Sequence, residues 1–332
     1  MPTFHKGVWA HSAGSLGEDE ESIRRAIGRL ADGGFDLLIP CIKQVRGYVD
    51  YHSNVARVRP EYKDWDRLTV MAESAREHGI KIHPWFCVFT EGKNSALIEN
   101  HPEFRAKDRE GNDAVQGNIL YWACTARPEV QDYEFALYEE VMDNYDVAGV
   151  HLDYIRAGAR AFCCCDYCQE AGGIKKSLTE LSQKDSEWSD WIDWRAGNVT
   201  RFVERVHKAA SERKMEVSAA VFPQYPECIV DDAQNWAQWA EMGLIDFIFP
   251  MNYTNSTEIA VRRTTNHIAS VKGNCPVWEG LGKQSADSAT STRTLIDQTK
   301  GVLEEGADGI VIFSYPAVTD EDIEALKALG SS

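Results

Sequence analysis

Eight short apolar segments recur along the chain, and a stretch with helical character follows each of them. A short apolar run bounded by turn residues is typical of a buried strand in an α/β protein. The predicted strands cover residues 7–10, 35–40, 80–86, 147–154, 216–223, 244–253, 277–280 and 309–315. The predicted helices cover residues 21–31, 64–78, 128–144, 186–214, 230–242, 257–271, 291–305 and 320–328. Strands that alternate with helices in this way form a parallel sheet.

Eight strand–helix pairs in a chain of 332 residues favour a closed barrel over an open doubly wound sheet. No phosphate-binding glycine loop follows the first strand, which also weighs against a dinucleotide-binding fold. We see no linker that would divide the chain. The sequence therefore predicts an α/β protein with a single (β/α)8 TIM barrel over residues 1–332, with a loop insertion at about 90–122 and a cysteine-rich loop at about 157–175.

The fourth predicted strand, residues 147–154, ends in polar side chains. Because side chains alternate along a strand, Gly149, His151 and Asp153 share one face. Polar groups at the carboxyl ends of strands are where a parallel barrel carries its chemistry. Asp153 is therefore the first catalytic candidate. The alternative is that Asp153 only caps a following helix or pairs with Arg156.

A second carboxylate is needed if the chemistry is glycoside hydrolysis, in which one group protonates the leaving oxygen and another stabilises or attacks the sugar. Asp153 and Glu279 lie on the fourth and seventh predicted strands, which face each other across a barrel. We predict that they are the catalytic pair, with Glu279 as nucleophile and Asp153 as acid/base, by analogy with many retaining barrels. Glu227 and Glu91 are the reserve candidates.

Other polar and aromatic residues follow the predicted strands, and we expect them to contact the substrate. Those predicted to bond sugar hydroxyls are His11, His83, Tyr154, Asn252 and Tyr253, and those predicted to stack on sugar rings are Trp9, Trp85 and Trp278. Arg156 is a further candidate for substrate binding. The ten Trp and twelve Tyr are many for this length, although core packing accounts for most of them. The net charge of -17 disfavours a nucleic acid or an anionic membrane as partner. A neutral or cationic substrate fits better, and the substrate that we expect is an oligo- or polysaccharide.

The start of the chain and the cysteines bear on where the protein resides. Residues 1–6 contain no apolar stretch long enough for a signal peptide, and no segment is long enough to span a membrane. Nine cysteines, an odd number, argue against a disulfide scaffold. We therefore expect a cytoplasmic protein, although a chain trimmed of its signal peptide would look the same at its start.

Two sets of residues have the composition of metal sites. His83, His151 and Asp153 combine two imidazoles with a carboxylate, a common ligand set for transition metals. If they bind a metal, the alternative function is a metal-dependent lyase or isomerase on the same scaffold. For the glycoside hydrolase we expect no cofactor in catalysis.

The second set is a Cys-x-Cys-x-x-Cys run of Cys163, Cys165 and Cys168 on the loop after the fourth strand. These thiols are close enough in sequence to bind one structural zinc, and free thiols without a metal are the alternative. The candidates for a fourth ligand are Cys124, Cys164 and Asp166.

Several stretches of sequence carry a resemblance to a known family. The most specific is Gly-Val-His-Leu-Asp-Tyr-Ile-Arg at 149–156, followed by Phe-Cys-Cys-Cys-Asp-Tyr-Cys at 162–168. The others are residues 7–9, 83–86, 218–223 and 246–253. They resemble the glycosyl-hydrolase-like family 10 proteins over nearly the whole chain. The resemblance implies a (β/α)8 hydrolase of glycosidic bonds with Asp153 in its active site, and some relatives are thought to cleave bacterial cell-wall glycans.

The chain also departs from that family's pattern. Asn252 stands where Asp is often found, Arg156 is followed by Ala-Gly instead of Tyr-Pro, and Glu279 matches no family motif. The fourth strand is also similar to chitinase-type barrels, but Ile155 occupies the position of their acid glutamate, which disfavours substrate-assisted cleavage by that acid. We predict a glycoside hydrolase (EC 3.2.1.-), and the main alternative is a non-catalytic carbohydrate-binding barrel.

Overall fold

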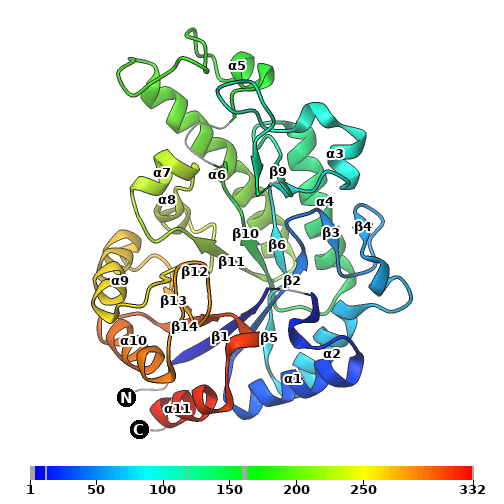
Figure 1. Ribbon diagram of the computed structural model, residues 1–332, viewed down its shortest axis with the longest axis vertical. Helices are drawn as coiled ribbons and strands as arrows, with labels where there is room; N and C mark the ends of the chain where they lie inside the picture. The colour runs from blue at the N-terminus through cyan, green and yellow to red at the C-terminus, as the bar shows by residue number, and fades with distance from the viewer. Residues whose placement is uncertain (1–3, 12, 118, 159–162, 331–332) are drawn as a thin grey trace.

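The computed structural model describes residues 4–11, 13–117, 119–158 and 163–330. Within these residues, parallel strands at eight positions form a nearly closed barrel (Figure 1). Around the barrel these are β1 (His5–Ala10), β2 (Leu37–Lys43), β5 (Lys81–Ile82) with β6 (Trp85–Cys87), β10 (Gly149–Asp153), β11 (Glu216–Val221), β12 (Phe247–Pro250), β13 (Trp278–Gly282) and β14 (Gly309–Phe313). Parallel bridges from Ile248 to Val277 and from Met251 to Gly280 join β12 to β13. The predicted (β/α)8 fold is confirmed.

Helices surround this barrel (Figure 1). The longer ones are α1 (Glu20–Asp32), α2 (Arg67–His78), α4 (Pro128–Asn144), α6 (Trp188–Glu212), α9 (Thr257–Val271), α10 (Thr292–Glu304) and α11 (Asp320–Gly330). The short ones are α3 (Ala96–Asn100), α5 (Asp166–Ala171), α7 (Glu227–Asp232) and α8 (Trp236–Glu241), with 3-10 turns at Ala13–Leu16, Pro60–Tyr62, Pro102–Phe104 and Tyr315–Ala317. Asp19, Asp66, Ser256 and Ser291 cap α1, α2, α9 and α10 by accepting a backbone N–H. None of the described helices is both long and apolar enough to cross a membrane.

Two predicted elements are divided in the structure. The predicted strand 80–86 is split into β5 and β6 on either side of Pro84, which has no N–H to donate to the sheet. The predicted helix 230–242 becomes α7 and α8, separated at Ala233, whose backbone is left-handed with φ of 58°. Both breaks leave the parallel order of the barrel unchanged.

The insertion predicted as a loop at about 90–122 is folded. It contains β7 (Thr90–Glu91), β8 (Val115–Gln116) and β9 (Leu120–Trp122), which form a small antiparallel sheet in the order β7-β9-β8. In Figure 1, β9 and α3 lie at the same end of the molecule as α5, beyond the barrel. A smaller pair, β3 (Tyr48–Val49) and β4 (Arg57–Val58), extends from β2.

A buried ion-pair cluster joins this insertion to the barrel. The Lys43 ammonium lies 2.9 Å from a carboxylate oxygen of Glu91 and 2.8 Å from one of Glu134, and all three side chains are fully buried. Burial lowers the pKa of Lys43, but the Glu134 and Glu91 carboxylates outweigh that effect and hold the pKa above its ordinary value. Gly47 has a φ of 73°, and a Cβ there would collide with Glu91, so only glycine fits beside the cluster.

Lys43→Met should destabilise the protein by about 3–5 kcal/mol at neutral pH, because it leaves two buried carboxylates without their cation. The loss should shrink as the pH falls, since burial raises the pKa of Glu134 and protonation removes the unpaired charge. Urea unfolding at two pH values measures both effects. Arg293→Met is the matched control, because it breaks an exposed i,i+4 pair with Asp297 and should change stability little. A Lys43→Met variant as stable as the wild type would contradict this account.

Candidate active site

A cavity of about 920 Å³ opens at the carboxyl ends of the barrel strands. Seven residues predicted from the sequence line it, namely Trp9, His11, Trp85, Asp153, Tyr154, Arg156 and Tyr253. They come from strands on opposite sides of the barrel or from the residues that follow those strands, so the fold brings together side chains that are far apart in the sequence. This is the position at which TIM barrels carry their active sites.

Asp153 ends β10 and lies in the cavity with only 6% of its surface exposed. Its Oδ1 accepts a 2.6 Å hydrogen bond from the Tyr154 backbone N–H and lies 3.8 Å from Nη1 of Arg156. Burial raises the pKa of Asp153 above its ordinary value, and the Arg156 charge opposes this shift. The carboxyl group therefore holds its proton to a higher pH than an exposed aspartate does.

Tyr154 and Arg156, which follow Asp153 in the sequence, form one wall of the cavity. Tyr154 has a left-handed backbone with φ of 51°, a strained conformation for a tyrosine. The Arg156 guanidinium lies over the rings of Tyr154, Phe222 and Trp122, at 4.3, 4.6 and 5.7 Å from their centroids. Its buried Nη1 makes no hydrogen bond within the described part of the chain. The three aromatic rings thus fix a cation whose Nη1 lies beside the Asp153 carboxyl group.

Below Asp153, a row of hydrogen bonds crosses the barrel interior. Trp9 Nε1–H donates to His151 Nε2 at 3.1 Å, and His151 Nδ1 is 2.9 Å from Ser218 Oγ. The same hydroxyl is 2.9 Å from His83 Nδ1, and His83 Nε2 is 3.1 Å from Glu216. The indole N–H can only donate, so His151 Nε2 accepts and the proton of neutral His151 is on Nδ1. His151 can then donate to Ser218, Ser218 to His83, and His83 to Glu216.

This hydrogen-bonded row bears on the predicted metal set of His83, His151 and Asp153. Both nitrogens of each histidine already have a protein partner. Among the residues that the structure describes, the side chains whose geometry suits a metal are instead those of a cysteine cluster. The geometry therefore does not support the metal-dependent alternative at the barrel axis.

Glu279 does not face Asp153, so the expected placement of the carboxylate pair is wrong. Glu279 is fully buried on the outer side of β13, where Oε1 is 2.7 Å from His267 Nδ1 and Oε2 accepts a 3.0 Å bond from Asn252 Nδ2. Asn252 also donates to the Ala260 carbonyl of α9, so it too points away from the cavity. Glu279 and Asn252 join the barrel to its helices.

His83 and Trp278 were also expected at the cavity, and the structure places both at the opposite end of the barrel. They line a smaller cavity of about 270 Å³ together with His5 and Glu216. Trp278 stacks on His5 with ring centroids 5.0 Å apart. Trp278 begins β13 rather than ending it, because the strand runs to Gly282, two residues further than predicted.

The reserve carboxylates are also away from Asp153. Glu91 is bound to Lys43, and Glu227 is an exposed residue that lines a neighbouring cavity of about 750 Å³. That cavity shares Phe222, Pro223, Gln224 and Arg263 with the main one, so the two adjoin. It also contains Asp231 and Asp232, and burial raises the pKa of Asp232 to about 6 against the opposing charge of Arg156.

Asp287 is a cavity residue that sequence reasoning missed. It lies exposed in the loop after β13, where Gln284 and Ala289 form an antiparallel bridge, and it interacts electrostatically with Arg263. A signal was present in the sequence, since Asp287 follows the seventh predicted strand. Because β13 runs to Gly282, the residues that reach the cavity come later in the sequence than the predicted end of this strand at residue 280.

The fold and this cavity define a TIM-barrel protein with a buried carboxyl group at its mouth. A family model described as glycosyl hydrolase-like 10 matches residues 5–277, and the chain belongs to that family. The family resemblance of the sequence is therefore confirmed.

Curated relatives match at low identity. Glycosyl hydrolase YngK of Bacillus subtilis is 22% identical over an alignment of 281 residues, and the match covers 74% of this chain and 51% of that protein. Glycosyl hydrolase DigH of Escherichia coli K12 is 24% identical over an alignment of 265 residues, and the match covers 70% of this chain and 53% of that protein. The chain thus spans about half the length of these relatives.

The glycoside hydrolase domain of PgaB (BpsB) from Bordetella bronchiseptica has the same fold. Its TM-score is 0.78 at 13% identity, and the match covers 98% of each chain. The catalytic domain of β-amylase from Paenibacillus polymyxa matches with a TM-score of 0.67 at 11% identity, over 98% of this chain and 97% of that one. At these identities the likeness concerns the fold.

The row of hydrogen bonds makes a prediction about histidine protonation. Burial lowers the pKa of His151 well below its ordinary value, and a positive charge on His83 would lower it further. We expect His151 to stay neutral with its proton on Nδ1 between about pH 5 and pH 8. Long-range ¹H–¹⁵N NMR of the imidazoles measures the tautomer and any titration. Protonation of His151 in this range, or a proton on Nε2, would rule out the order of donors and acceptors from Trp9 to Glu216.

Proposed function

We propose that the protein is a glycoside hydrolase in which Asp153 is the general acid. The observation that carries the proposal is the buried Asp153 carboxyl group in the main cavity, with its pKa raised by burial. A carboxyl group whose pKa is raised keeps its proton to a higher pH, and in that form it can protonate the oxygen of a glycosidic bond as the bond breaks. Membership in a glycosyl hydrolase-like family supports the same reaction class.

Asp287 is the proposed second carboxylate. It is the other acidic side chain among the described residues that line the main cavity with Asp153. As a carboxylate at the rim, it would stabilise positive charge at the anomeric carbon, directly or through the attacking water. This replaces Glu279, which is bound to His267 and Asn252 outside the barrel.

The proposed substrate is an oligo- or polysaccharide. Two adjoining cavities of about 920 and 750 Å³ offer room for more than one sugar unit. Trp9, Trp85 and Tyr253 supply aromatic surface to the main cavity. The neighbouring cavity contains three acidic residues, Glu227, Asp231 and Asp232, and two basic ones, Arg262 and Arg263. Because the chain as a whole carries a net charge of -17, a neutral or cationic glycan is favoured over an anionic one.

Substitution of the carboxylates tests this assignment. Purified protein is screened against aryl glycosides and natural glycans, including peptidoglycan strands, and the variants are then assayed on the substrate that is cleaved. Asp153→Asn should lower kcat by about 10²–10⁴, because the general acid is lost, and Asp287→Asn should also lower it strongly. Glu279→Gln should keep kcat within a few-fold, because Glu279 lies outside the cavity.

The pattern among the three variants identifies which part of the proposal is wrong. A folded Glu279→Gln variant without activity would restore the predicted Asp153–Glu279 pair. Full activity in Asp287→Asn would remove Asp287 from the mechanism but leave Asp153 in place. If glycan affinity survives in Asp153→Asn and no substrate is cleaved by the wild type, the protein is a carbohydrate-binding barrel and not a hydrolase.

The pH profile provides a separate test of Asp153 as the acid. A general acid is active when protonated, so kcat/KM should fall as the pH rises through the Asp153 pKa. Arg156 holds that pKa down, so Arg156→Gln should move the alkaline limb of kcat/KM to higher pH, in addition to any loss of binding. Arg262→Gln, an exposed residue of the neighbouring cavity, is the control and should leave the limb unchanged. A limb that moves to lower pH in Arg156→Gln would exclude Asp153 as the acid.

A further inference from the structure

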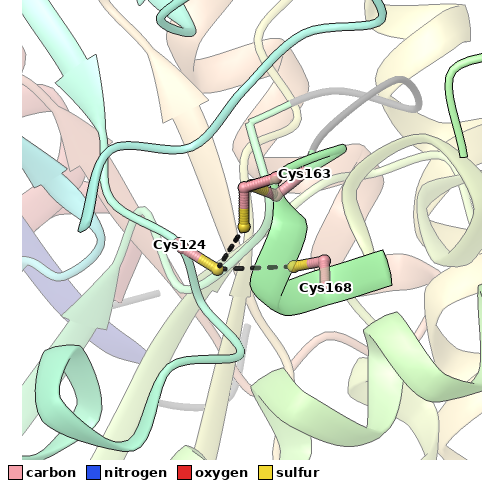
Figure 2. Close-up of side chains that lie close together, drawn as sticks. Cys124, Cys163 and Cys168 are labelled. Atoms are coloured by element: carbon pink, nitrogen blue, oxygen red, sulfur yellow. Dashed lines mark hydrogen bonds between the residues drawn. The ribbon is translucent and has the colours of Figure 1, made fainter. Parts of the chain in front are cut away.

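Four cysteines from two distant parts of the sequence meet in the interior. Cys124 lies between β9 and α4, and Cys163, Cys165 and Cys168 lie at or just before α5. All four are buried, and their sulfur atoms lie within 4.8 Å of one another. Figure 2 shows the Cys124 sulfur pointing toward those of Cys163 and Cys168. The cluster lies outside the cavity and has no part in the mechanism proposed above.

The spacing of the sulfur atoms fits a shared ligand at their centre. Cys124 Sγ is 3.4 Å from Cys168 Sγ and 3.7 Å from Cys165 Sγ. Four thiolates at about 2.3 Å from a tetrahedral zinc would have sulfur atoms about 3.8 Å apart. A disulfide would instead bring a pair of sulfurs to about 2.05 Å. The observed spacing is thus that of thiols around a shared ion and not that of a disulfide.

The surroundings select Cys124 as the fourth ligand. Cys164 directs its thiol to the Leu178 carbonyl at 3.6 Å, and Asp166 is exposed. The Lys107 backbone N–H donates to Cys163 Sγ at 3.2 Å, a contact that stabilises a thiolate. The buried Arg195 guanidinium interacts electrostatically with Cys163 and Cys168, and it would offset part of the negative charge of four thiolates around a divalent ion.

We propose that Cys124, Cys163, Cys165 and Cys168 bind one structural zinc ion. The ion binds as the four thiols release their protons, and no redox step is involved. It joins the insertion that contains β7, β8 and β9 to the loop after β10. A backbone hydrogen bond from the Cys164 N–H to the Lys107 carbonyl, at 2.9 Å, already links these two segments beside the cluster.

The zinc would also stabilise one wall of the cavity. Trp122 is two residues before Cys124, and its ring lies 5.8 Å from that of Tyr154 and contacts Arg156. A Cβ at Gly158 would lie within 2.4 Å of the Trp122 ring, so the loop after β10 packs directly on this tryptophan. Fixing Cys124 relative to Cys163 therefore fixes Trp122 against Tyr154 and Arg156.

The test is the metal content of the full chain, purified without chelator from zinc-supplemented cells. We expect one zinc per chain by elemental analysis and by native mass spectrometry. Cobalt substituted for zinc should produce the intense sulfur-to-metal absorption and visible bands of a tetrahedral tetrathiolate. Cys124→Ser should lose the zinc or bind it much more weakly, whereas Cys164→Ser, a change in the same loop as the other three ligands, should keep one zinc per chain.

Other outcomes overturn the proposal without relying on the variants. A folded wild-type protein without stoichiometric zinc, whose nine cysteines all react as free thiols after denaturation, would contradict it. Disulfides among the four residues in a metal-free protein would do the same. Cobalt spectra of a site with fewer than four sulfur ligands would exclude the four-cysteine site. If Cys124→Ser does not fold, the wild-type stoichiometry and cobalt spectrum still decide the question, and neither depends on finding the glycan substrate.

Discussion

The alternation of side chains along the strands of a closed barrel decides which residues of this protein meet. Every strand residue points either to the axis or to the helices, and neighbouring residues point in opposite directions. On β10 this places His151 and Asp153 inside, next to Trp9 and the cavity. On β13 it places Trp278 inside and Glu279 outside. A shift of one residue in either strand would exchange these roles.

The interior of the barrel is accordingly divided into a polar centre and an apolar surround. The row from Trp9 through His151, Ser218 and His83 to Glu216 gives each buried polar atom of these side chains a partner. Unpaired, such groups would each cost about 1–3 kcal/mol. Satisfied internally, they form a rigid layer under Asp153. The geometry explains why His151 and His83, which were possible metal ligands in the sequence, have a packing role.

The cavity wall is stabilised from behind by two features of different chemistry. On one side, Lys43 with Glu91 and Glu134 joins β2 and the start of the insertion to α4. On the other side, the cysteine cluster joins the end of the insertion to the loop after β10. Between them, Trp122 packs on Tyr154 and Arg156, and Arg156 adjusts the acidity of Asp153. The environment of one carboxyl group thus depends on a segment that is not part of the barrel.

By itself the sequence determined the barrel, the order of its strands and the position of Asp153 at a strand end, because repeated apolar runs and helix caps are local signals. It also determined the acidic character of the protein and the cysteine run at Cys163, Cys165 and Cys168. Only the tertiary structure decided that Glu279 and Asn252 face the helices, that Asp287 enters the cavity and that Cys124 completes the cluster. The first outcome depends on which side chains of β13, and of the residues after β12, point to the helices, and the local sequence does not specify this. The other two outcomes depend on contacts between distant segments. Such contacts follow from packing a closed sheet, and no local pattern encodes them.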